Sequence, residues 1–392
     1  MCFGHHRTWH DIMCSSYIFR ADGQKESCMS SDKTVIVIGG GLGGVSAAIS
    51  LAQKGFNVRL FEKNGHLGGK LNRLEKDGFT FDLGPSILTM PQIFEKLFRD
   101  GGRDMADYVK IQRLDLEWRS FFPDGSVIDL YGDLDRMAQA NPQIDPKHME
   151  EYRAFLDYAR NLYDATDKGY FEMGLENTPE VLPAYDQLLG EKDYADKKRE
   201  KFEPACSGLV LHLGVDRLYP QLAHHNFFFS SNPRGHFNKV FHSHELPDDP
   251  ILYVVNSSKT DPGQALPGHE NIKILPHIPY IQDKDFSREE YMQLRERVLI
   301  KMENMGITDL RKHIVTEDMW IPADIKHMYK SDRGAIYGTL SDKKKNKGFK
   351  NPKKSALFDN LYFVGGTVNP GGGMPMVTLS GQKTAELIAE GR

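Results

Sequence analysis

Residues 34–62 read TVIVIGGGLGGVSAAISLAQKGFNVRLFE, and this stretch decides the fold prediction. Thr34–Ile38 is a short, β-branched apolar run, which is typical of a strand buried on both faces. Val45–Lys54 carries apolar residues at helical spacing, Gly55 ends that predicted helix, and Asn57–Glu62 predicts a second strand. The stretch therefore predicts one βαβ unit of an α/β protein.

The glycines between the first strand and the helix form a G-x-G-x-x-G pattern. Gly39 permits the tight turn, Gly41 lets a pyrophosphate approach the backbone, and Gly44 allows close packing of helix and strand. Glu62 ends the second strand, where its carboxylate can accept hydrogen bonds from ribose hydroxyls. The pattern predicts a dinucleotide-binding site, with a purely structural glycine turn as the alternative.

A second glycine pair follows soon after Glu62. Gly68, Gly69 and Lys70 can bring another backbone segment and a positive charge against the same pyrophosphate. An ordinary Gly-Gly turn is the alternative. The layout E-K-x-x-x-x-G-G-K resembles that of the two-dinucleotide-binding-domain flavoproteins. This resemblance favours FAD over a nicotinamide cofactor.

The C-terminal region repeats the order of strand, glycine-rich loop and helix. Leu361–Val364 predicts a buried strand, and Val377–Glu390 predicts a terminal helix. Unpaired N–H groups at the start of that helix would point at whatever occupies the loop, and they would favour a flavin ring that gains negative charge on reduction. The candidate residues of this loop are Gly366, Gly372, Met374 and Pro375.

The segments VIVIGGGLGG, EKNGHLGGK, DGFTFDLGPSIL and LYFVGGTVNPGGGMPMVTLSGQ resemble the phytoene desaturase-type carotenoid oxidoreductases, and most closely the diaponeurosporene and diapolycopene oxygenases. The likeness runs from about Lys33 to the C-terminus. It implies a Rossmann-like FAD-binding domain, adds Gly84 and Pro85 to the expected FAD site, and implies oxidation of a polyene's terminal methyl group to an aldehyde. Desaturation along the polyene is the alternative, since no single residue decides between the two reactions.

Composition and substrate chemistry narrow the expected partners. The formal charge of −4 gives no basic field for nucleic acid, and no apolar run in the sequence is long enough to span a bilayer. Because a polyene is insoluble, the resemblance implies a cytoplasmic protein that associates peripherally with a membrane surface. The sequence leaves the oligomeric state open.

Three regions are expected along the chain. Residues 1–32 are interpreted as a disordered or non-native leader; histidines and cysteines there match no structural zinc pattern, so no metal site is predicted. Residues 33–150 with 355–392 are assigned to the FAD-binding domain, and residues 151–354 to an α+β substrate domain. That second domain is expected to be truncated near 171–201, which raises the alternative of an inactive flavin-binding remnant.

No side chain is assigned a catalytic role. His224 and His225 precede an aromatic strand, and since neighbouring strand residues face opposite sides, at most one could reach a site. A structural role is favoured for both, and His277 is left ambiguous. The aromatic residues assigned to the core rather than to polyene contacts are Trp118, Phe121 and Phe122. Other predicted strands are 78–82, 126–131, 209–213, 226–229, 251–255 and 272–275, and other predicted helices are 91–99, 148–163 and 288–305.

Overall fold

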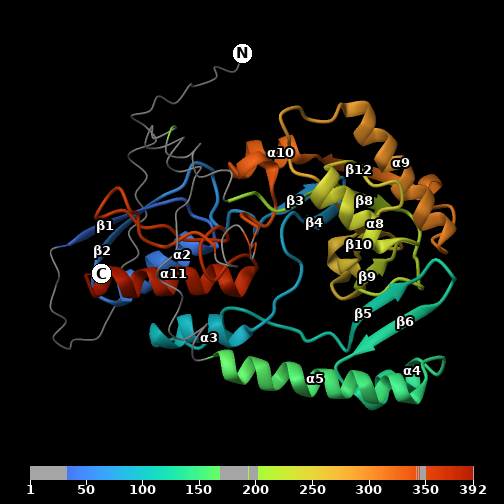
Figure 1. Cartoon of the computed structure of the whole chain (residues 1–392), viewed down its shortest axis with the longest axis horizontal. Coiled ribbons are helices and arrows are strands. Elements are labelled where there is room, and N and C mark those ends of the chain that lie inside the picture. Colours follow the sequence, from blue (N-terminus) through green and yellow to red (C-terminus); the bar gives the residue numbers. More distant parts are fainter. Residues whose placement is uncertain are drawn as a thin grey trace.

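The computed structural model describes residues 33–167, 202–340 and 350–391, with single positions at 193, 342 and 344. In Figure 1 a small sheet with its helices lies on one side of the molecule, and a large sheet lies on the other. The predicted leader and nearly all of the segment 171–201 fall outside the described residues.

The predicted βαβ unit is confirmed. Strand β1 (Thr34–Ile38) leads through helix α2 (Leu42–Gln53) to β2 (Asn57–Phe61), and the two strands pair in parallel. The expectation that β1 is buried on both faces is wrong, because Ile36 is 61% exposed and Ile38 is 73% exposed. Among the described strands β1 pairs only with β2, and the helices cover one face of this pair (Figure 1).

The predicted terminal helix is α11 (Met374–Ala389), which lies along α2. The two helix backbones approach so closely that a Cβ atom on Gly381 would lie 2.5 Å from the carbonyl oxygen of Gly43 and 2.6 Å from the amide nitrogen of Ala47. The hydroxyl of Ser46 donates to the carbonyl oxygen of Thr378 at 2.7 Å. The first and last helices of the described chain therefore form one packed unit.

The predicted buried strand Leu361–Val364 is wrong. Only an isolated bridge between Lys354 and Tyr362 forms there, although Phe363 is buried. A strand needs a neighbouring ladder for its backbone groups. Here the amide of Phe363 donates to the carbonyl oxygen of Lys353 at 2.6 Å, within an irregular segment.

The large sheet has eight described strands in the order β12-β8-β11-β10-β9-β5-β6, with β7 paired to β11. Strands β5 and β9 pair in parallel, and the other pairs are antiparallel. Although β5 and β6 fall within the segment 33–150 assigned to the FAD-binding domain, they complete this sheet. The bounds are β5 (Leu116–Phe121), β6 (Val127–Tyr131), β7 (Ser207–Gly208), β8 (Val210–Val215), β9 (His225–Phe228), β10 (Leu252–Val255), β11 (Glu270–Ile278) and β12 (Ile314–Trp320).

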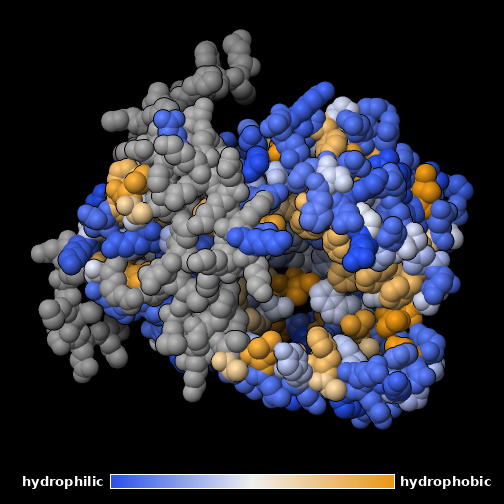
Figure 2. Space-filling model, in the orientation of Figure 1, coloured by the Kyte–Doolittle hydropathy of each residue, from blue (hydrophilic) through white to orange (hydrophobic). Residues whose placement is uncertain are grey.

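Alternation along these strands gives the large sheet two different faces. Phe228, Leu252, Val254 and Ile274 are fully buried and join the main apolar core, which includes residues of α9. Their strand neighbours point to the opposite face, which carries aromatic and polar side chains instead. Figure 2 shows the molecule hollowed between α5 and the sheet, with apolar surface around the hollow.

The remaining elements surround these two sheets. Helix α9 begins with a capping box in which Ser287 and Glu290 exchange hydrogen bonds, as expected for a helix predicted from 288. The predicted elements on described residues, apart from 361–364, are present and differ only at their ends. The elements that were not predicted are β3, β5, β7, β12, α4, α8 and α10. The bounds are β3 (Arg73–Lys76), β4 (Phe79–Asp82), α3 (Pro91–Asp100), α4 (Leu134–Ala140), α5 (Pro146–Thr166), α8 (Pro233–Asn238), α9 (Arg288–Asn304) and α10 (Pro322–Tyr329).

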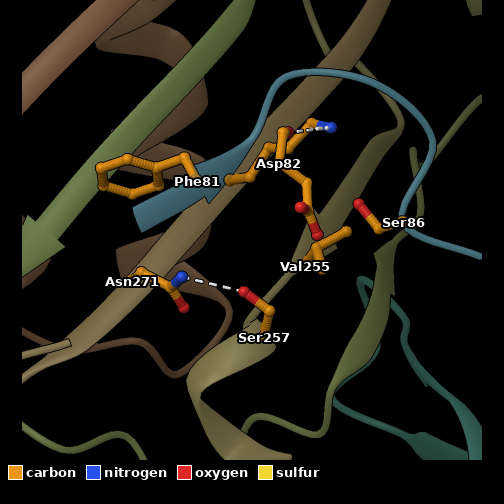
Figure 3. Close-up of a pocket in the computed structure, with 7 residues that line it drawn as sticks. Phe81, Asp82, Ser86, Val255, Ser257 and Asn271 are labelled. Atoms are coloured by element: carbon orange, nitrogen blue, oxygen red, sulfur yellow. Dashed lines mark hydrogen bonds between the residues drawn. The ribbon is translucent and has the colours of Figure 1, made fainter. Parts of the chain in front are cut away.

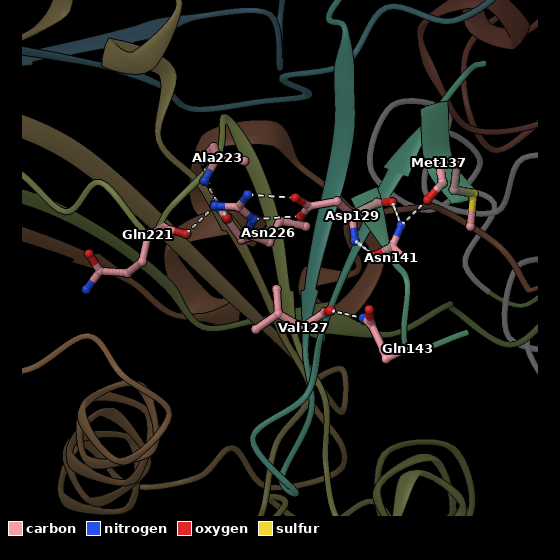
Figure 4. A network of polar contacts seen from close by, with 9 residues as sticks. Val127, Asp129, Met137, Asn141, Gln143, Gln221, Ala223 and Asn226 are labelled. Atoms are coloured by element: carbon pink, nitrogen blue, oxygen red, sulfur yellow. Dashed lines mark hydrogen bonds and ion pairs between the residues drawn. The ribbon is translucent and has the colours of Figure 1, made fainter. Parts of the chain in front are cut away.

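A polar network stabilises the edge of the large sheet that is formed by β5 and β6 (Figure 4). Arg119 on β5 binds both carboxylate oxygens of Asp129 on β6 at 2.7 Å, and it also donates to the carbonyl oxygen of Gln221 at 2.9 Å. Asn141 exchanges hydrogen bonds with the backbone of Asp129 at 2.7 and 2.8 Å. Paired and bidentate contacts of this kind hold β6 in register although it is an edge strand.

Lys273 ties the large sheet to β4. Its ammonium group donates to the carbonyl oxygens of Asp82 at 2.8 Å and Gly84 at 2.5 Å. Burial lowers the pKa of Lys273 to about 8. The adjoining cavity (Figure 3), which also contacts Ser257 and Asn271, has a volume of about 10 Å³. Since that is room for about one water molecule, the cavity is a packing gap rather than a ligand site.

We expect Gly381→Ala to lower the free energy of unfolding by about 1–3 kcal/mol, because the added methyl group overlaps the backbone of α2. An alanine normally stabilises a helix relative to glycine, so a lower free energy of unfolding in this variant would come from the steric overlap. Ala389→Leu, at an exposed position of the same helix, should change stability by less than about 0.5 kcal/mol. Denaturant midpoints measure both; an unchanged or more stable Gly381→Ala variant would contradict the close packing.

We expect the stability difference between the wild type and Lys273→Met to depend on pH. The folded protein releases the Lys273 proton near pH 8, whereas the unfolded chain holds it to about 10.5. Between these values the unfolded state binds more protons, so wild-type stability rises with pH by up to about 1.4 kcal/mol per unit relative to the variant. Denaturant unfolding at pH 7, 8, 9 and 10 measures this; a constant difference would show that Lys273 titrates normally.

Candidate active site

The glycine turn after β1 has the geometry of a phosphate-binding loop. Gly39 has φ of +97°, and a Cβ on Gly44 would lie 2.0 Å from the carbonyl oxygen of Gly39, so the turn requires both glycines. Gly41 caps α2 without a side-chain hydrogen bond, and a Cβ built on it would meet no atom within 4 Å. The start of α2 therefore presents backbone N–H groups beside open space, as anion binding requires.

Glu62 lies at this turn. One carboxylate oxygen accepts from the amide of Gly40 at 2.7 Å, and the other accepts from the amide of Asn64 at 2.9 Å. A carboxylate offers about four lone-pair positions, so Glu62 keeps capacity for a ribose hydroxyl. Its position fits the role that the sequence predicts.

The second glycine pair lies directly against the first turn. Gly68 forms a bridge with Gly41, and its amide donates to the carbonyl oxygen of Gly40 at 2.8 Å. Gly69 approaches so closely that its Cβ position lies 3.0 Å from Cα of Gly41. The two segments meet as the sequence predicts.

Lys70 makes a different contact from the predicted one. Its ammonium group donates to the carbonyl oxygen of Ile336 at 2.7 Å, and burial lowers its pKa to about 8. A contact between Lys70 and pyrophosphate stays a prediction. Gly84 lies near this lysine and accepts from Lys273, whereas Pro85 is exposed.

The C-terminal loop meets the same region. A Cβ on Gly43 would lie 3.0 Å from the amide nitrogen of Gly365, whose N–H donates to the hydroxyl of Ser380 at 2.8 Å. A Cβ on Gly366 would lie 3.4 Å from Cα of Gly372. The next residue, Gly373, caps α11, which begins with Met374 and the buried Pro375. Both ends of the described chain therefore contribute to one site.

Sequence reasoning missed the segment 336–339, which links these parts. The carbonyl oxygen of Ile336 accepts from Lys70, and that of Tyr337 lies 3.4 Å from the Cβ position of Gly372. Gly338 has φ of +75°, and its Cβ position lies 3.1 Å from the carbonyl oxygen of Gly366. Gly338 is the one residue of this segment whose type favours a turn, and it does not predict which loops lie nearby.

The paired histidines have structural contacts. His225 lies 2.9 Å from the Tyr253 hydroxyl through Nδ1, and burial lowers its pKa to about 3, so it is neutral near pH 7. His224 lies 2.6 Å from the Thr260 hydroxyl. The expectation that the two rings face opposite sides is wrong, since their centroids are 4.3 Å apart; His224 precedes β9 and does not follow its alternation.

The predicted core aromatics divide between the two faces of the sheet. Phe121 stacks on Phe228 with centroids 4.5 Å apart, and it is buried. Phe122 stacks on Phe229 at 4.9 Å. Trp118 is only partly buried and packs against Phe227 on the other face. Its assignment to the core is therefore correct only in part.

Two negative findings apply to the described ranges. No group of three or more His, Cys, Asp or Glu side chains there is arranged to hold a metal ion. None of the helices there has both the length and the apolar character needed to cross a bilayer. The leader histidines and cysteines lie outside the described residues.

Comparison with known proteins identifies the relatives of this chain. The family described as NAD(P)-binding Rossmann-like domain matches residues 37–100. A 4,4'-diaponeurosporene oxygenase from Staphylococcus haemolyticus is 43% identical over 488 residues, covering 91% of this chain and 97% of the relative. One from Staphylococcus aureus is 43% identical over 486 residues, covering 91% and 98%.

The alignment also shows a difference in length. Because 91% of the 392 residues is about 357, the 488-residue alignment includes about 130 positions at which the relative has residues and this chain has none.

Solved structures share the fold. An oxidoreductase from Methanosarcina mazei superposes with a TM-score of 0.56 at 14% identity, covering 90% of this chain and 100% of its own. A putrescine oxidase variant redesigned in cofactor binding gives 0.53 at 11% identity, covering 91% and 99%. The match to the Rossmann-like domain indicates a dinucleotide cofactor. At 43% identity over most of its length, this chain belongs to the family of carotenoid oxidoreductases that contains the 4,4'-diaponeurosporene oxygenases.

Proposed function

We propose that this protein uses FAD to oxidise the terminal methyl group of a diapocarotenoid to an aldehyde. The observation that carries the proposal is the meeting of the Gly39–Gly44 turn, the Gly68–Gly69 pair and the Gly365–Gly373 loop at one place. The names of the relatives support the polyene substrate and the oxygenase reaction. In the overall reaction one dioxygen yields the aldehyde and one water.

The residues present fit the proposed cofactor. The open space at Gly41 and the uncapped start of α2 would hold the pyrophosphate, and Glu62 would bind the adenosine ribose. The loop before α11 would hold the flavin ring, with Gly373 and Met374 presenting the helix start to it. When bound, FAD supplies the electron transfer and the activation of dioxygen.

A desaturase is the alternative of the same class. It would use the same cofactor site and the same polyene, and it would remove hydrogen along the chain rather than add oxygen at its end. The oxygenase is preferred because the relatives at 43% identity are 4,4'-diaponeurosporene oxygenases.

An inactive flavin-binding remnant is the alternative of another class. Two observations favour it: the exposed side chains of Ile36 and Ile38 on β1, and the roughly 130 alignment positions without a counterpart in this chain. An open apolar sheet face is unfavourable by about 25 cal/mol per Å². Formation of an oxidised or desaturated polyene by the flavin-containing protein decides between an enzyme and such a remnant.

We also propose that the protein is cytoplasmic and binds a membrane surface, from which it takes its insoluble substrate. Phe155, Tyr158 and Leu162 are exposed at helical spacing along one side of α5. Apolar side chains on one helix face favour insertion into the interfacial region of a bilayer. This stripe supports peripheral binding.

Expression in a host that makes diaponeurosporene tests the proposed reaction. We expect a yellow protein that releases FAD on denaturation, together with a polyene aldehyde in the cell extract. A polyene with a longer chromophore and no oxygen would identify a desaturase. A protein that forms neither product would identify the remnant, and the absence of released flavin would show that this remnant does not hold the cofactor.

Gly41→Val provides the matched control. Because its Cβ position faces open space and its φ is −66°, valine should fit the fold but occupy the space expected for the pyrophosphate. We expect unchanged thermal unfolding of the flavin-free protein and at least about tenfold weaker flavin binding. Wild-type flavin content in this variant would contradict the assignment of the turn.

Membrane binding is tested by sedimentation with vesicles of phosphatidylcholine and phosphatidylglycerol. We expect Phe155→Asp combined with Leu162→Asp to weaken binding at least about tenfold, because two apolar side chains are lost from the contact. Asn161→Asp, an exposed position of the same helix, controls for the added charge. Equal binding by the double variant and the wild type would exclude α5 as the contact.

A further inference from the structure

An apolar cavity of about 430 Å³ lies next to the C-terminal loop. Phe237 comes from α8, Phe241 from the π-helical turn Lys239–Ser243, and Leu340 from the segment after Tyr337. This volume falls in the range of small-molecule sites, whereas the cavity beside Lys273 holds only about one water. A long polyene could place only one end in it.

The wall of this cavity is the backbone segment that also borders the proposed cofactor loop. Ala205 donates through its amide to the carbonyl oxygen of Gly338 at 2.7 Å, and the amide of Ile336 donates to that of Cys206 at 3.2 Å. The same segment contacts Gly366 and Gly372 on its other side. Whatever enters the cavity therefore lies one backbone layer from the loop.

Most polar groups of the cavity wall are already engaged. Lys350 donates to the carbonyl oxygen of Thr339, and Asn351 donates to the hydroxyl of Thr339 at 3.2 Å. Burial raises the pKa of the Cys206 thiol to about 12, which leaves it neutral and a poor nucleophile. The remaining polar pair is His277 and Tyr337, whose Nε2 and hydroxyl oxygen lie 3.2 Å apart.

An aromatic row leads to this pair along the open face of the large sheet. Ring centroids of Trp118 and Phe227 are 5.4 Å apart, and those of Phe227 and Tyr253 are 5.2 Å apart. Tyr253 lies opposite Leu275, and His277, two residues further along β11, points to the same face. These rings are partly exposed, unlike the fully buried side chains of the opposite face.

We propose that this cavity holds the end of the polyene that is oxidised, and that the Tyr337–His277 pair hydrogen-bonds the oxygen introduced there. This inference rests on the proposed function. The apolar side chains Phe237, Phe241 and Leu340 match a methyl-bearing hydrocarbon end. In the proposed arrangement, Nε2–H of neutral His277 donates to the Tyr337 hydroxyl oxygen, and the single Tyr337 O–H proton donates to the aldehyde oxygen, which a methyl group cannot replace as acceptor. Tyr337 is thus a positioning residue that distinguishes the oxidised from the unoxidised end.

In this proposal the row of Trp118, Phe227 and Tyr253 contacts the part of the polyene that lies outside the cavity. Flat rings beside a conjugated chain give a large apolar contact with defined geometry. The row and the cavity share one sheet face, so a single extended ligand can contact both.

Titration of the full chain with two polyenes of equal length, one ending in methyl and one in aldehyde, tests the proposal. We expect the wild type to bind both and to red-shift the absorption of the aldehyde only, because a donor to its carbonyl oxygen lowers the excitation energy. Tyr337→Phe should lose the shift and bind the aldehyde about tenfold more weakly, with hydrocarbon affinity unchanged. Phe241→Ala should weaken binding of both polyenes.

Tyr108→Phe, at an exposed tyrosine between α3 and β5, is the matched control and should leave both titrations unchanged. An unchanged aldehyde shift in Tyr337→Phe, or a wild type that binds neither polyene, would overturn the assignment. Flavin content and the product formed in cells are measured on the same variants. A wild type that binds the polyenes but contains no flavin, or forms no aldehyde in cells, would instead count against the proposed function alone.

Discussion

Backbone contact between glycines is the constraint on which this structure depends. The turn that begins α2 touches the Gly68–Gly69 pair on one side and Gly365 on the other, and a Cβ atom on Gly69 or on Gly43 would lie 3.0 Å from the facing backbone. Three segments from distant parts of the sequence therefore meet at one helix start. The amides of Gly68 and Gly365 are used in hydrogen bonds that hold these segments together, so it is the N–H groups and the positive end of α2 that favour an anionic ligand there. A side chain at Gly43 or at Gly69 would hold the segment that carries it away from the backbone that it faces.

The two faces of the large sheet differ: one forms the main apolar core, and the other carries the side chains proposed to contact substrate. Its α9 side is a continuous apolar core, in which Phe228, Leu252 and Val254 are inaccessible to solvent. Its other side carries Phe227 and Tyr253, and His277 on the same face contacts Tyr337 in the segment that borders the C-terminal loop. Alternation along a strand produces both faces from one stretch of sequence. The rigid core thus holds the aromatic face in a fixed position relative to the dinucleotide site.

The small sheet is the least complete part of the molecule. Strand β1 has one described partner, and Ile36 and Ile38 expose large apolar surfaces. A parallel strand normally has both faces covered and a neighbour on each side. The alignment positions without a counterpart in this chain are numerous enough to include such neighbours. The exposed strand is consistent with a shortened member of its family, in which the glycine contacts and the large sheet persist.

The sequence by itself determined the βαβ unit and the terminal helix, since glycine spacing and apolar periodicity are local properties; the dinucleotide-site candidates that it named stay predictions. It misassigned Leu361–Val364 and the burial of β1, because a strand's environment depends on neighbours that its own residues do not specify. Only the tertiary structure decided that Lys70 contacts Ile336 and that Tyr337 lies between the C-terminal loop and a cavity. Lys70 and Ile336 are 266 positions apart in the sequence, and the geometry of both contacts is set by chain packing rather than by any local pattern.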